Sequence, residues 1–296
     1  WNCFDVFVHS NIVYNNAGIM KNIAVLGDGV TGSAVTNYIN NSNNYKLVGI
    51  NDADAIVTSP GIPPDQYPQS SAIFMSELEF SLMILKNKEK NVRIVGVTGT
   101  NGKTTVVSGI SHCSGFLAYG NIGTPLISNI DSIKENDTIV LELSSYQLFT
   151  SSSLICDVAV ILNITQDHLE WHKTFQAYKN AKLSIIKKNN IQHIIAPQSL
   201  LPDIEPLMHS KSMIHTIEDC DNQLNDIKVD ACNRENFGVI KKICQIICPV
   251  ELNINAMLNS IPLPLYRCQK VYDDFDRTII NDSKSTNMAA TIHALN

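Results

Sequence analysis

A glycine-rich segment that ends in lysine and threonine, GTNGKTT at residues 99–105, lies between an apolar run at 92–97 and a stretch with helical character. In a strand–loop–helix unit of this kind, glycines let backbone N–H groups turn inward around phosphate oxygens, and the helix N-terminus adds positive potential. Lys103 would reach the outer phosphates, and Thr104 would offer its hydroxyl to Mg²⁺. A strict Walker A motif has glycine where this chain has Val97, so a simple glycine turn is the alternative; the local context favours a nucleoside triphosphate site.

Strands and helices alternate along the rest of the chain. Apolar runs typical of strands lie at 21–26, 45–50, 55–58, 92–97, 138–141, 158–162 and 278–280. Helical patterns lie at 77–86, 175–188 and 236–247. This alternation predicts an α/β fold with doubly wound parallel sheets.

Length, charge and cysteine content exclude several classes of protein. The 296 residues suffice for about two domains and part of a third. A net charge of −6 argues against general nucleic-acid binding, and no apolar run is long enough to predict a membrane span. The eight cysteines are scattered and form no C-x-x-C pair, which favours reduced thiols. We therefore expect a cytoplasmic protein, a monomer without nucleic-acid or membrane partners.

Composition also suggests where domains begin and end. Residues 1–19 lack the basic start and unbroken apolar stretch of a signal peptide, and we treat them as an extension with no predicted structure. The polar segment 87–91 and the prolines 262 and 264 mark two linkers. We expect a first domain at 20–90, a central domain at 91–263 and the start of a third at 264–296, which is too short for a complete domain.

A second glycine motif, GDGVTG at residues 27–32, directly follows the first predicted strand. Asp52 lies about twenty residues beyond it, the spacing at which a dinucleotide-binding fold holds a ribose. Glycines at these positions also allow a strand and a helix to pack closely. The motif alone leaves both a nicotinamide or flavin site and a purely structural role open.

Polar residues follow two further predicted strands. Glu142 ends the strand at 138–141, and Asp167 and His168 follow the strand at 158–162. In open α/β sheets, ligands bind at the carboxyl ends of parallel strands, and carboxylates there hold metal ions in phosphoryl-transfer proteins. A solvated strand end and a hydrogen-bonded loop histidine are the alternatives for Glu142 and His168 taken singly.

Five motifs occur in a fixed order: GTNGKTT at 99–105, NIG at 121–123, LELSSYQL at 141–148, NITQDH at 163–168 with AKL at 181–183, and NDSKSTN at 281–287. Together they resemble the Mur ligases over residues 20–296. LELSSYQL and NDSKSTN are similar to the members that join D-glutamate to UDP-N-acetylmuramoyl-L-alanine. The resemblance implies a Rossmann-like UDP-binding domain, a P-loop-type ATPase domain with a parallel sheet, and the start of a truncated third Rossmann-like domain.

The resemblance also implies an activity. Such enzymes use ATP to phosphorylate the substrate carboxylate, and the amine of D-glutamate then displaces phosphate from the acyl phosphate, in peptidoglycan synthesis. Because the third domain is incomplete, we expect that this chain is a fragment whose own activity is in question. The alternatives are another Mur or folylpolyglutamate-type ligase, a remnant that binds ATP or UDP-substrate without forming the amide, and, more distantly, a nicotinamide-dependent oxidoreductase.

Individual roles follow from the same resemblance. The implied catalytic residues are Lys103, Glu142, His168, Lys182 and Lys284. Those implied to bind ATP are Gly99, Thr100, Asn101, Gly102, Lys103, Thr104, Thr105, Asn233, Asn236, Arg267 and Asp282. Those implied to bind the UDP-substrate are Val30, Thr31, Ser59, Gly61, Asn121 and His168.

Two Mg²⁺ sites are implied. Thr104 and Glu142 would hold the first ion, and His168 and Lys182 the second, with Lys182 carbamylated by CO₂ so that it is anionic. Without the resemblance, a solvated basic helix face would be the obvious interpretation of Lys182. Two departures from the family pattern affect these expectations: Cys232 stands where histidine is usual, and the first domain is short, which puts the uracil contacts in doubt.

Overall fold

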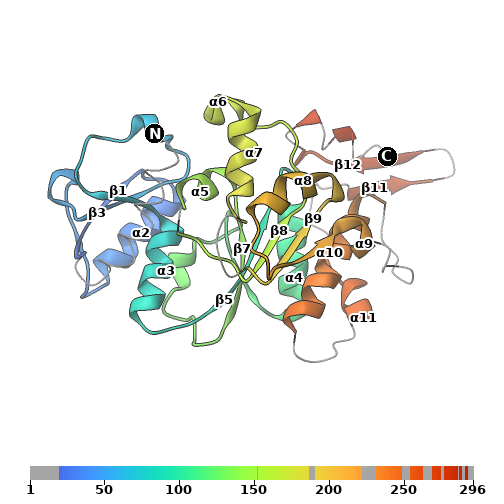
Figure 1. Ribbon diagram of the computed structural model, residues 1–296, viewed down its shortest axis with the longest axis horizontal. Coiled ribbons are helices and arrows are strands. Elements are labelled where there is room, and N and C mark those ends of the chain that lie inside the picture. Colours follow the sequence, from blue (N-terminus) through green and yellow to red (C-terminus); the bar gives the residue numbers. More distant parts are fainter. Residues whose placement is uncertain are drawn as a thin grey trace.

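The computed structural model describes residues 20–296 apart from 152, 187–190, 222–223, 225–230, 249–253, 263–268, 275–276, 286, 289–290 and 293–296. Within the described ranges there are three sheets, which follow one another across the molecule in chain order (Figure 1). The two larger sheets are parallel throughout, so the predicted α/β class is confirmed.

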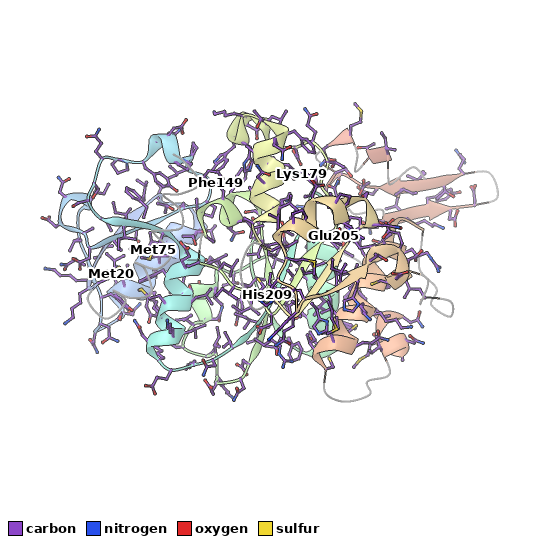
Figure 2. All side chains as sticks on the ribbon, in the orientation of Figure 1. Met20, Met75, Phe149, Lys179, Glu205 and His209 are labelled. Atoms are coloured by element: carbon purple, nitrogen blue, oxygen red, sulfur yellow. The ribbon has the colours of Figure 1, made fainter. Side chains whose placement is uncertain are left out.

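The first sheet has four strands in the order β2-β1-β3-β4. These are β1 (Asn22–Leu26), β2 (Lys46–Leu47), β3 (Ala55–Thr58) and β4 (Ile73–Ser76). Two helices and two 3₁₀ turns accompany them: α2 (Val30–Asn40), α3 (Glu77–Asn87), η1 (Ile50–Asp52) and η2 (Pro64–Gln66). Met20 and Met75 mark this part of the core in Figure 2, where both lie on the side of the first sheet.

The central sheet has six strands in the order β10-β9-β8-β5-β7-β6. These are β5 (Arg93–Thr98), β6 (Leu117–Gly120), β7 (Thr138–Glu142), β8 (Val158–Ile161), β9 (His193–Ala196) and β10 (Met213–Thr216). The α-helices associated with it are α4 (Lys103–Ser114), α5 (Ser145–Thr150), α6 (Leu169–His172), α7 (Phe175–Leu183), α8 (Leu201–Ile204), α9 (Ile217–Asp221), α10 (Ala231–Ile247) and α11 (Ile254–Leu258). Short 3₁₀ turns are η3 (Leu126–Asn129), η4 (Gln198–Leu200) and η5 (Glu205–Leu207).

Alternation of side chains along the central strands creates two apolar cores. Ile139 and Leu141 of β7 point into one core, and Val140 between them points into the other. This is the pattern expected of a strand that is covered on both faces. The second core contains the apolar residues of α4 and α10, whereas the first is continuous with residues of the first sheet and α3. The first two sheets therefore share one apolar core.

Helix α3 joins the first sheet to the central one and is anchored by buried polar contacts. Ser76 and Glu79 form a capping box at its N-terminus, in which each side chain bonds the other residue's backbone N–H. Glu79 also accepts hydrogen bonds from the backbone and hydroxyl of Ser153, each at 2.7 Å. Glu77 is 3% exposed and accepts a 2.7 Å bond from the backbone of Ile127. Burial raises the pKa of the Glu77 carboxyl.

The last two strands of the described chain, β11 (Gln269–Asp273) and β12 (Thr278–Asn281), form a hairpin on the opposite side of the central sheet from the first sheet (Figure 1). The strand expected at 278–280 is present, but it pairs antiparallel with its neighbour. Val271 and Ile279 are about half exposed, at 52% and 51%.

Several predicted boundaries were wrong. The strand expected at 45–50 is reduced to Lys46–Leu47, because the chain turns into a 3₁₀ helix at Ile50. The helix expected at 175–188 ends at Leu183, and residues 187–188 lie outside the described part. Strands β4, β6, β9 and β10, each four residues long, were missed. Among the described residues, no helix has the length and apolar character needed to cross a membrane.

Candidate functional site

The GTNGKTT segment forms a tight loop between β5 and α4. Gly102 has a φ of +85°, which favours glycine, and a Cβ atom there would lie 2.6 Å from the Oδ1 atom of Asn236. Asn163, two residues after the end of β8, holds the loop from the other side. Its carbonyl accepts a 2.9 Å bond from the Thr100 backbone, and its side chain accepts one of 2.8 Å from the Asn101 backbone. Chain segments far apart in sequence therefore fix the loop.

Two lysines meet beneath this loop. The Nζ atoms of Lys103 and Lys182 both donate to the carbonyl oxygen of Gly99, at 2.9 and 2.8 Å. Lys182 is only 2% exposed, so the solvated basic face that its sequence context suggested is excluded. Burial lowers the pKa of Lys182 well below its usual value, and the Lys103 cation lowers it further; the carboxylates of Asp167 and Glu142 oppose the shift.

Glu142 ends β7 at the same edge of the central sheet and is 2% exposed. Its Oε1 atom accepts a 3.0 Å bond from the side-chain amide of Asn121. Its Oε2 atom is buried and has no hydrogen-bond partner among the described residues. A buried carboxylate oxygen without a partner is costly unless it binds a cation, so this oxygen fits a metal ligand. The described residues hold no cluster of three His, Cys, Asp or Glu side chains arranged for a metal.

The loop after β8 brings in the last described segment of the chain. Asp167 accepts a 2.9 Å bond from the backbone of His168 and a 3.1 Å bond from the side-chain amide of Asn287. The amides of Asn287 and Asn101 also contact each other at 3.3 Å. Asn287, the last residue of NDSKSTN, therefore contacts both the phosphate loop and the His168 loop.

An aromatic cluster supports α7, the helix that carries Lys182. The Tyr178 hydroxyl lies 2.9 Å from that of Thr100, and His172 lies 2.9 Å from the Ser145 hydroxyl. The Tyr146 and His172 rings stack with centroids 5.6 Å apart. Burial lowers the pKa of His172 to about 4, with help from His168 and Lys182, and raises that of Tyr146 to about 12. His172 is therefore neutral near pH 7.

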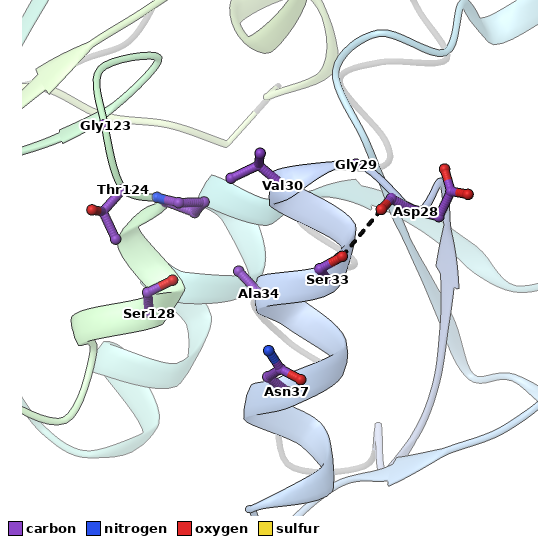
Figure 3. Close-up of a pocket in the computed structure, with 10 residues that line it drawn as sticks. Asp28, Gly29, Val30, Ser33, Ala34, Asn37, Gly123, Thr124 and Ser128 are labelled. Atoms are coloured by element: carbon purple, nitrogen blue, oxygen red, sulfur yellow. Dashed lines mark hydrogen bonds between the residues drawn. The ribbon is translucent and has the colours of Figure 1, made fainter.

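A separate pocket of about 530 Å³ lies where α2 faces the loop after β6 (Figure 3). Its lining residues come from two segments far apart in sequence: Asp28, Gly29, Val30, Ser33, Ala34 and Asn37, and Gly123, Thr124, Pro125 and Ser128. Figure 3 shows Val30 and Ser33 of α2 on one side of the pocket and Thr124 and Ser128 on the other. Gly29, the residue before α2, provides no side-chain cap, so the first N–H groups of the helix have no side-chain acceptor there and could bind a ligand.

The pocket is connected to Glu142, at the end of β7, through a short segment. Asn121 bonds Glu142 at one end of this segment, and Gly123 lines the pocket two residues later. Ser59 lies beneath the glycine turn: a Cβ on Gly32 would lie 3.2 Å from the Ser59 hydroxyl oxygen. That oxygen is buried without a partner in the described part of the chain.

Comparisons with known proteins agree with this geometry. Residues 97–199 match the Mur ligase middle domain. A UDP-N-acetylmuramoylalanine–D-glutamate ligase from Buchnera aphidicola is 34% identical over 285 residues, which cover 87% of this chain and 63% of that protein. One of the same name from Francisella tularensis is 27% identical over 307 residues, 96% of this chain and 72% of that protein. These matches support a Mur ligase, with residues 97–199 as its middle domain.

Solved structures show the same fold. A Thermotoga maritima MurF ligase in complex with ADP has a TM-score of 0.57 at 16% identity and covers 95% of this chain and 73% of its own. A MurF from Acinetobacter baumannii has a TM-score of 0.57 at 15% identity, and the match covers 94% of this chain and 69% of that one. At these identities the likeness concerns the fold alone.

Most predicted site residues of this chain fall into two groups. Around the phosphate loop lie Gly99, Thr100, Asn101, Gly102, Lys103, Glu142, Lys182 and Asn236. Thr104 and Thr105 follow in the first turn of α4, and Asn233, 5% exposed, lies on α10. Val30 lines the pocket on α2; Thr31 and Ser59 lie at the same glycine turn, and Gly61 is two residues further on.

The remaining predicted site residues fall outside these two groups. Asn121 bonds Glu142 and is not among the residues that line the pocket, and the His168 side chain is 41% exposed. Lys284 is exposed, and Asp282 contacts Ser285. Arg267 and the Cys232 side chain lie outside the described part.

Sequence reasoning missed contacts made by Asn163, Asp167, Tyr178 and Asn287. Asn163, Asp167 and Asn287 belong to the quoted motifs, and this membership was the signal by which they could have been found.

Proposed function

We propose that this chain is the nucleotide- and UDP-substrate-binding part of an ATP-dependent ligase that joins D-glutamate to UDP-N-acetylmuramoyl-L-alanine in peptidoglycan synthesis. The observation that carries the proposal is the unpartnered Oε2 of Glu142, which lies at the same sheet edge as the phosphate loop. The same carboxylate is linked through Asn121 to the segment that lines the pocket on α2. The names of the Buchnera and Francisella relatives supply the substrate and the amino acid.

The reaction has two balanced steps. A carboxylate oxygen of the UDP-substrate attacks the γ-phosphorus of ATP, the bond from that phosphorus to the bridging oxygen breaks, and ADP leaves. The amine of D-glutamate then attacks the acyl carbon, inorganic phosphate leaves, and the amine loses a proton. Phosphorylation is needed because an unmodified carboxylate has no acceptable leaving group.

Lys103 would hold the outer phosphates while the backbone N–H groups of the loop surround them. Its amine now donates to the carbonyls of Gly99 and Thr100, each at 2.9 Å, so it is already directed to the inner side of the loop. Thr104 and Glu142 would bind one Mg²⁺, and His168 and Lys182 a second. Bound Mg²⁺ would reduce the repulsion between ATP and the anionic acceptor.

Lys182 fits carbamylation because only a neutral amine can attack CO₂, a reaction that forms a carbamate and releases one proton. Its pKa is held well below the usual value, mainly by burial, so much more of the neutral amine is present than at an exposed lysine.

The adenine base of ATP and the amino acid D-glutamate would be held farther from the phosphate loop. We assign the adenine side to Asn233 and Asn236, since Asn236 packs against Gly102. Arg267, Asp282 and Lys284 are proposed to act from the segment 264–296, and Lys284 to lie nearest D-glutamate. Val30, Thr31, Ser59, Gly61 and Asn121, together with His168, are proposed for the UDP-substrate. The division into parts at 20–90, 91–263 and 264–296 belongs to the same proposal.

The deciding experiment measures phosphate release by this chain with ATP, Mg²⁺ and UDP-N-acetylmuramoyl-L-alanine, with and without D-glutamate. Release that requires all four components supports the ligase. Substituting L-glutamate for D-glutamate is the matched control and should give no release. If D-glutamate has no effect while ATP and UDP-N-acetylmuramoyl-L-alanine both bind in calorimetric titration, the chain binds these two ligands without forming the amide. If neither nucleotide binds, the proposed function is wrong.

A further inference from the structure

A cluster of three thiols lies between the helix that follows the phosphate loop and the helix that packs against it. Cys113 is in the last turn of α4, Cys244 is on α10, and Cys248 lies just beyond the end of α10. Cys113 and Cys244 are 1% and 0% exposed, whereas Cys248 is partly exposed. The two buried cysteines belong to one apolar core, and Cys248 packs against it.

The register of the two helices places these cysteines together. Near the start of α4, Gly102 contacts Asn236 of α10. Further along, a Cβ on Gly109 would lie 2.4 Å from the Cδ1 atom of Ile240, so the helices approach closely there. Four residues on along each helix, on the same face, stand Cys113 and Cys244. Cys248 follows Cys244 by one more turn, and its backbone N–H bonds the Cys244 carbonyl at 3.0 Å.

The acidities of the three thiols depend on one another. The side chain of Cys244 influences the pKa of both Cys113 and Cys248, and burial raises the pKa of Cys248. The side chain of Cys244 lowers the pKa of Cys113, whereas the side chain of Cys113 and burial raise the pKa of Cys244. The thiolate, which is the nucleophile in thiol–disulfide exchange, is therefore favoured at Cys113.

We propose that Cys248, Cys244 and Cys113 form a thiol–disulfide exchange site, in which a small disulfide of the glutathione type reacts at partly exposed Cys248 and oxidation passes inward to a Cys113–Cys244 disulfide. Such a link would join α4, which begins at Lys103, to α10, which carries Asn236. The two helices that flank the phosphate loop would then be covalently tied. This proposal is independent of the ligase reaction.

The exchange balances in three steps. The Cys248 thiolate attacks one sulfur of the small disulfide, and the first small thiolate leaves. The Cys244 thiolate attacks the Cys248 sulfur and expels the second. The Cys113 thiolate then attacks the Cys244 sulfur and returns Cys248 to a thiolate. In total two protein thiols are oxidised, one small disulfide is reduced to two thiols, and the hydrogens move from the protein to those thiols.

The test uses the full chain, reduced and then exposed to oxidised glutathione, with each cysteine followed by differential alkylation and peptide mass spectrometry. We expect Cys113 and Cys244 to be protected as a mutual disulfide, Cys248 to be free, and no glutathione to remain on any of the three. Buried Cys156 and Cys220, which lie outside the cluster, serve as internal references and should stay reduced.

Two variants separate the steps. Cys248→Ser should slow formation of the Cys113–Cys244 link at least tenfold, while Cys156→Ser should leave its rate unchanged. Cys244→Ala, checked for native circular dichroism, should retain glutathione on Cys248 because no neighbouring thiol resolves it. If wild type keeps glutathione on Cys248, or if Cys113 and Cys244 oxidise no faster than Cys156, the proposal is wrong; both results come from wild type and do not depend on a variant folding.

Discussion

Lys103 and Lys182 donate to the same acceptor, the carbonyl oxygen of Gly99, at 2.9 and 2.8 Å. Two ammonium groups this close repel each other, and Lys182 is the more buried of the two. The conflict is relieved if Lys182 gives up its proton, which is the direction in which its pKa is shifted. The surroundings of the phosphate loop therefore favour the neutral form of Lys182.

Replacing Lys103 should greatly reduce turnover. For Lys103→Ala in the full-length protein we expect D-glutamate-dependent phosphate release to fall by about three orders of magnitude or more, because phosphoryl transfer relies on positioning and electrostatic stabilisation. The measurement is phosphate release at saturating ATP and Mg²⁺. Lys134→Ala, which removes an exposed lysine far along the chain, is the matched control. Turnover within tenfold of wild type in Lys103→Ala would remove Lys103 from the mechanism.

For the buried lysine, chemical rescue is the sharper test. Lys182→Ala should lose phosphate release by a factor of about 10² or more, and added formate or acetate should restore part of it by supplying a carboxylate in place of the carbamate. Mass spectrometry of the wild type under CO₂ should detect the added carbamate after chemical trapping. Lys179→Ala, on the same helix and paired with Asp203, is the control. A lack of rescue at any carboxylate concentration, together with an unmodified Lys182, would contradict the role as metal ligand.

The sequence predicted those parts of the fold that depend on local pattern. The strand at 55–58 was placed at its observed bounds, because a short apolar run between turn residues determines it. The strand expected at 45–50 was overestimated, because its apolar residues 47–50 continue into a turn that only the tertiary context selects. Strands as short as β6 and β9 gain their stability from their neighbours in the sheet and leave little periodicity to detect.

The candidate site was likewise predictable only where it depends on local sequence pattern. The phosphate loop was recognisable because its glycines and lysine are contiguous. The burial of Lys182 was not, since its neighbours in sequence include exposed Lys173, and only packing against the phosphate loop decides which lysine faces inward. The contact of Asn287 with Asn101 spans 186 residues, a separation at which local pattern carries no information.

Replacing Glu142 with glutamine should raise the stability of the protein and lower its activity. Glu142→Gln keeps a hydrogen-bonding partner for Asn121 and removes a buried charge whose Oε2 is unpartnered. We expect the free energy of unfolding without metal to rise by about 1 kcal/mol, because the charged form of a buried carboxylate is poorly solvated when one of its oxygens has no hydrogen-bond partner. Phosphate release should fall at least a hundredfold and need more Mg²⁺. The comparison is urea unfolding and a Mg²⁺ titration of activity, with exposed Glu205→Gln as control. Unchanged Mg²⁺ dependence would contradict the assignment.

Two glycines with similar backbone angles allow the effect of backbone strain to be measured apart from the effect of a steric clash. Gly102 and Gly115 flank α4 with φ of +85° and +74°, but a Cβ would lie 2.6 Å from Asn236 at Gly102 and meet nothing within 4 Å at Gly115. Alanine at either position should cost about 1 kcal/mol for the left-handed backbone. Gly102→Ala should also weaken ATP binding about tenfold or more by displacing Asn236 and the loop. Calorimetric titration with ATP measures this, and equal affinities in the two variants would show that Asn236 plays no part.

Acid should destabilise the protein through His172. Its pKa is about 4 in the folded protein and 6.5 when unperturbed, so the unfolded state binds more protons between these values. The resulting stabilisation is present above the unperturbed pKa and is lost as the pH falls towards the folded one, a loss of about 2 kcal/mol between pH 7 and pH 5 from this residue alone. His172→Gln, which retains a partner for Ser145, should reduce the drop in unfolding free energy between these pH values by about that amount. Urea unfolding at the two pH values measures the change, with exposed His209→Gln as control. If the drop is the same in His172→Gln as in wild type, His172 is not the group that titrates.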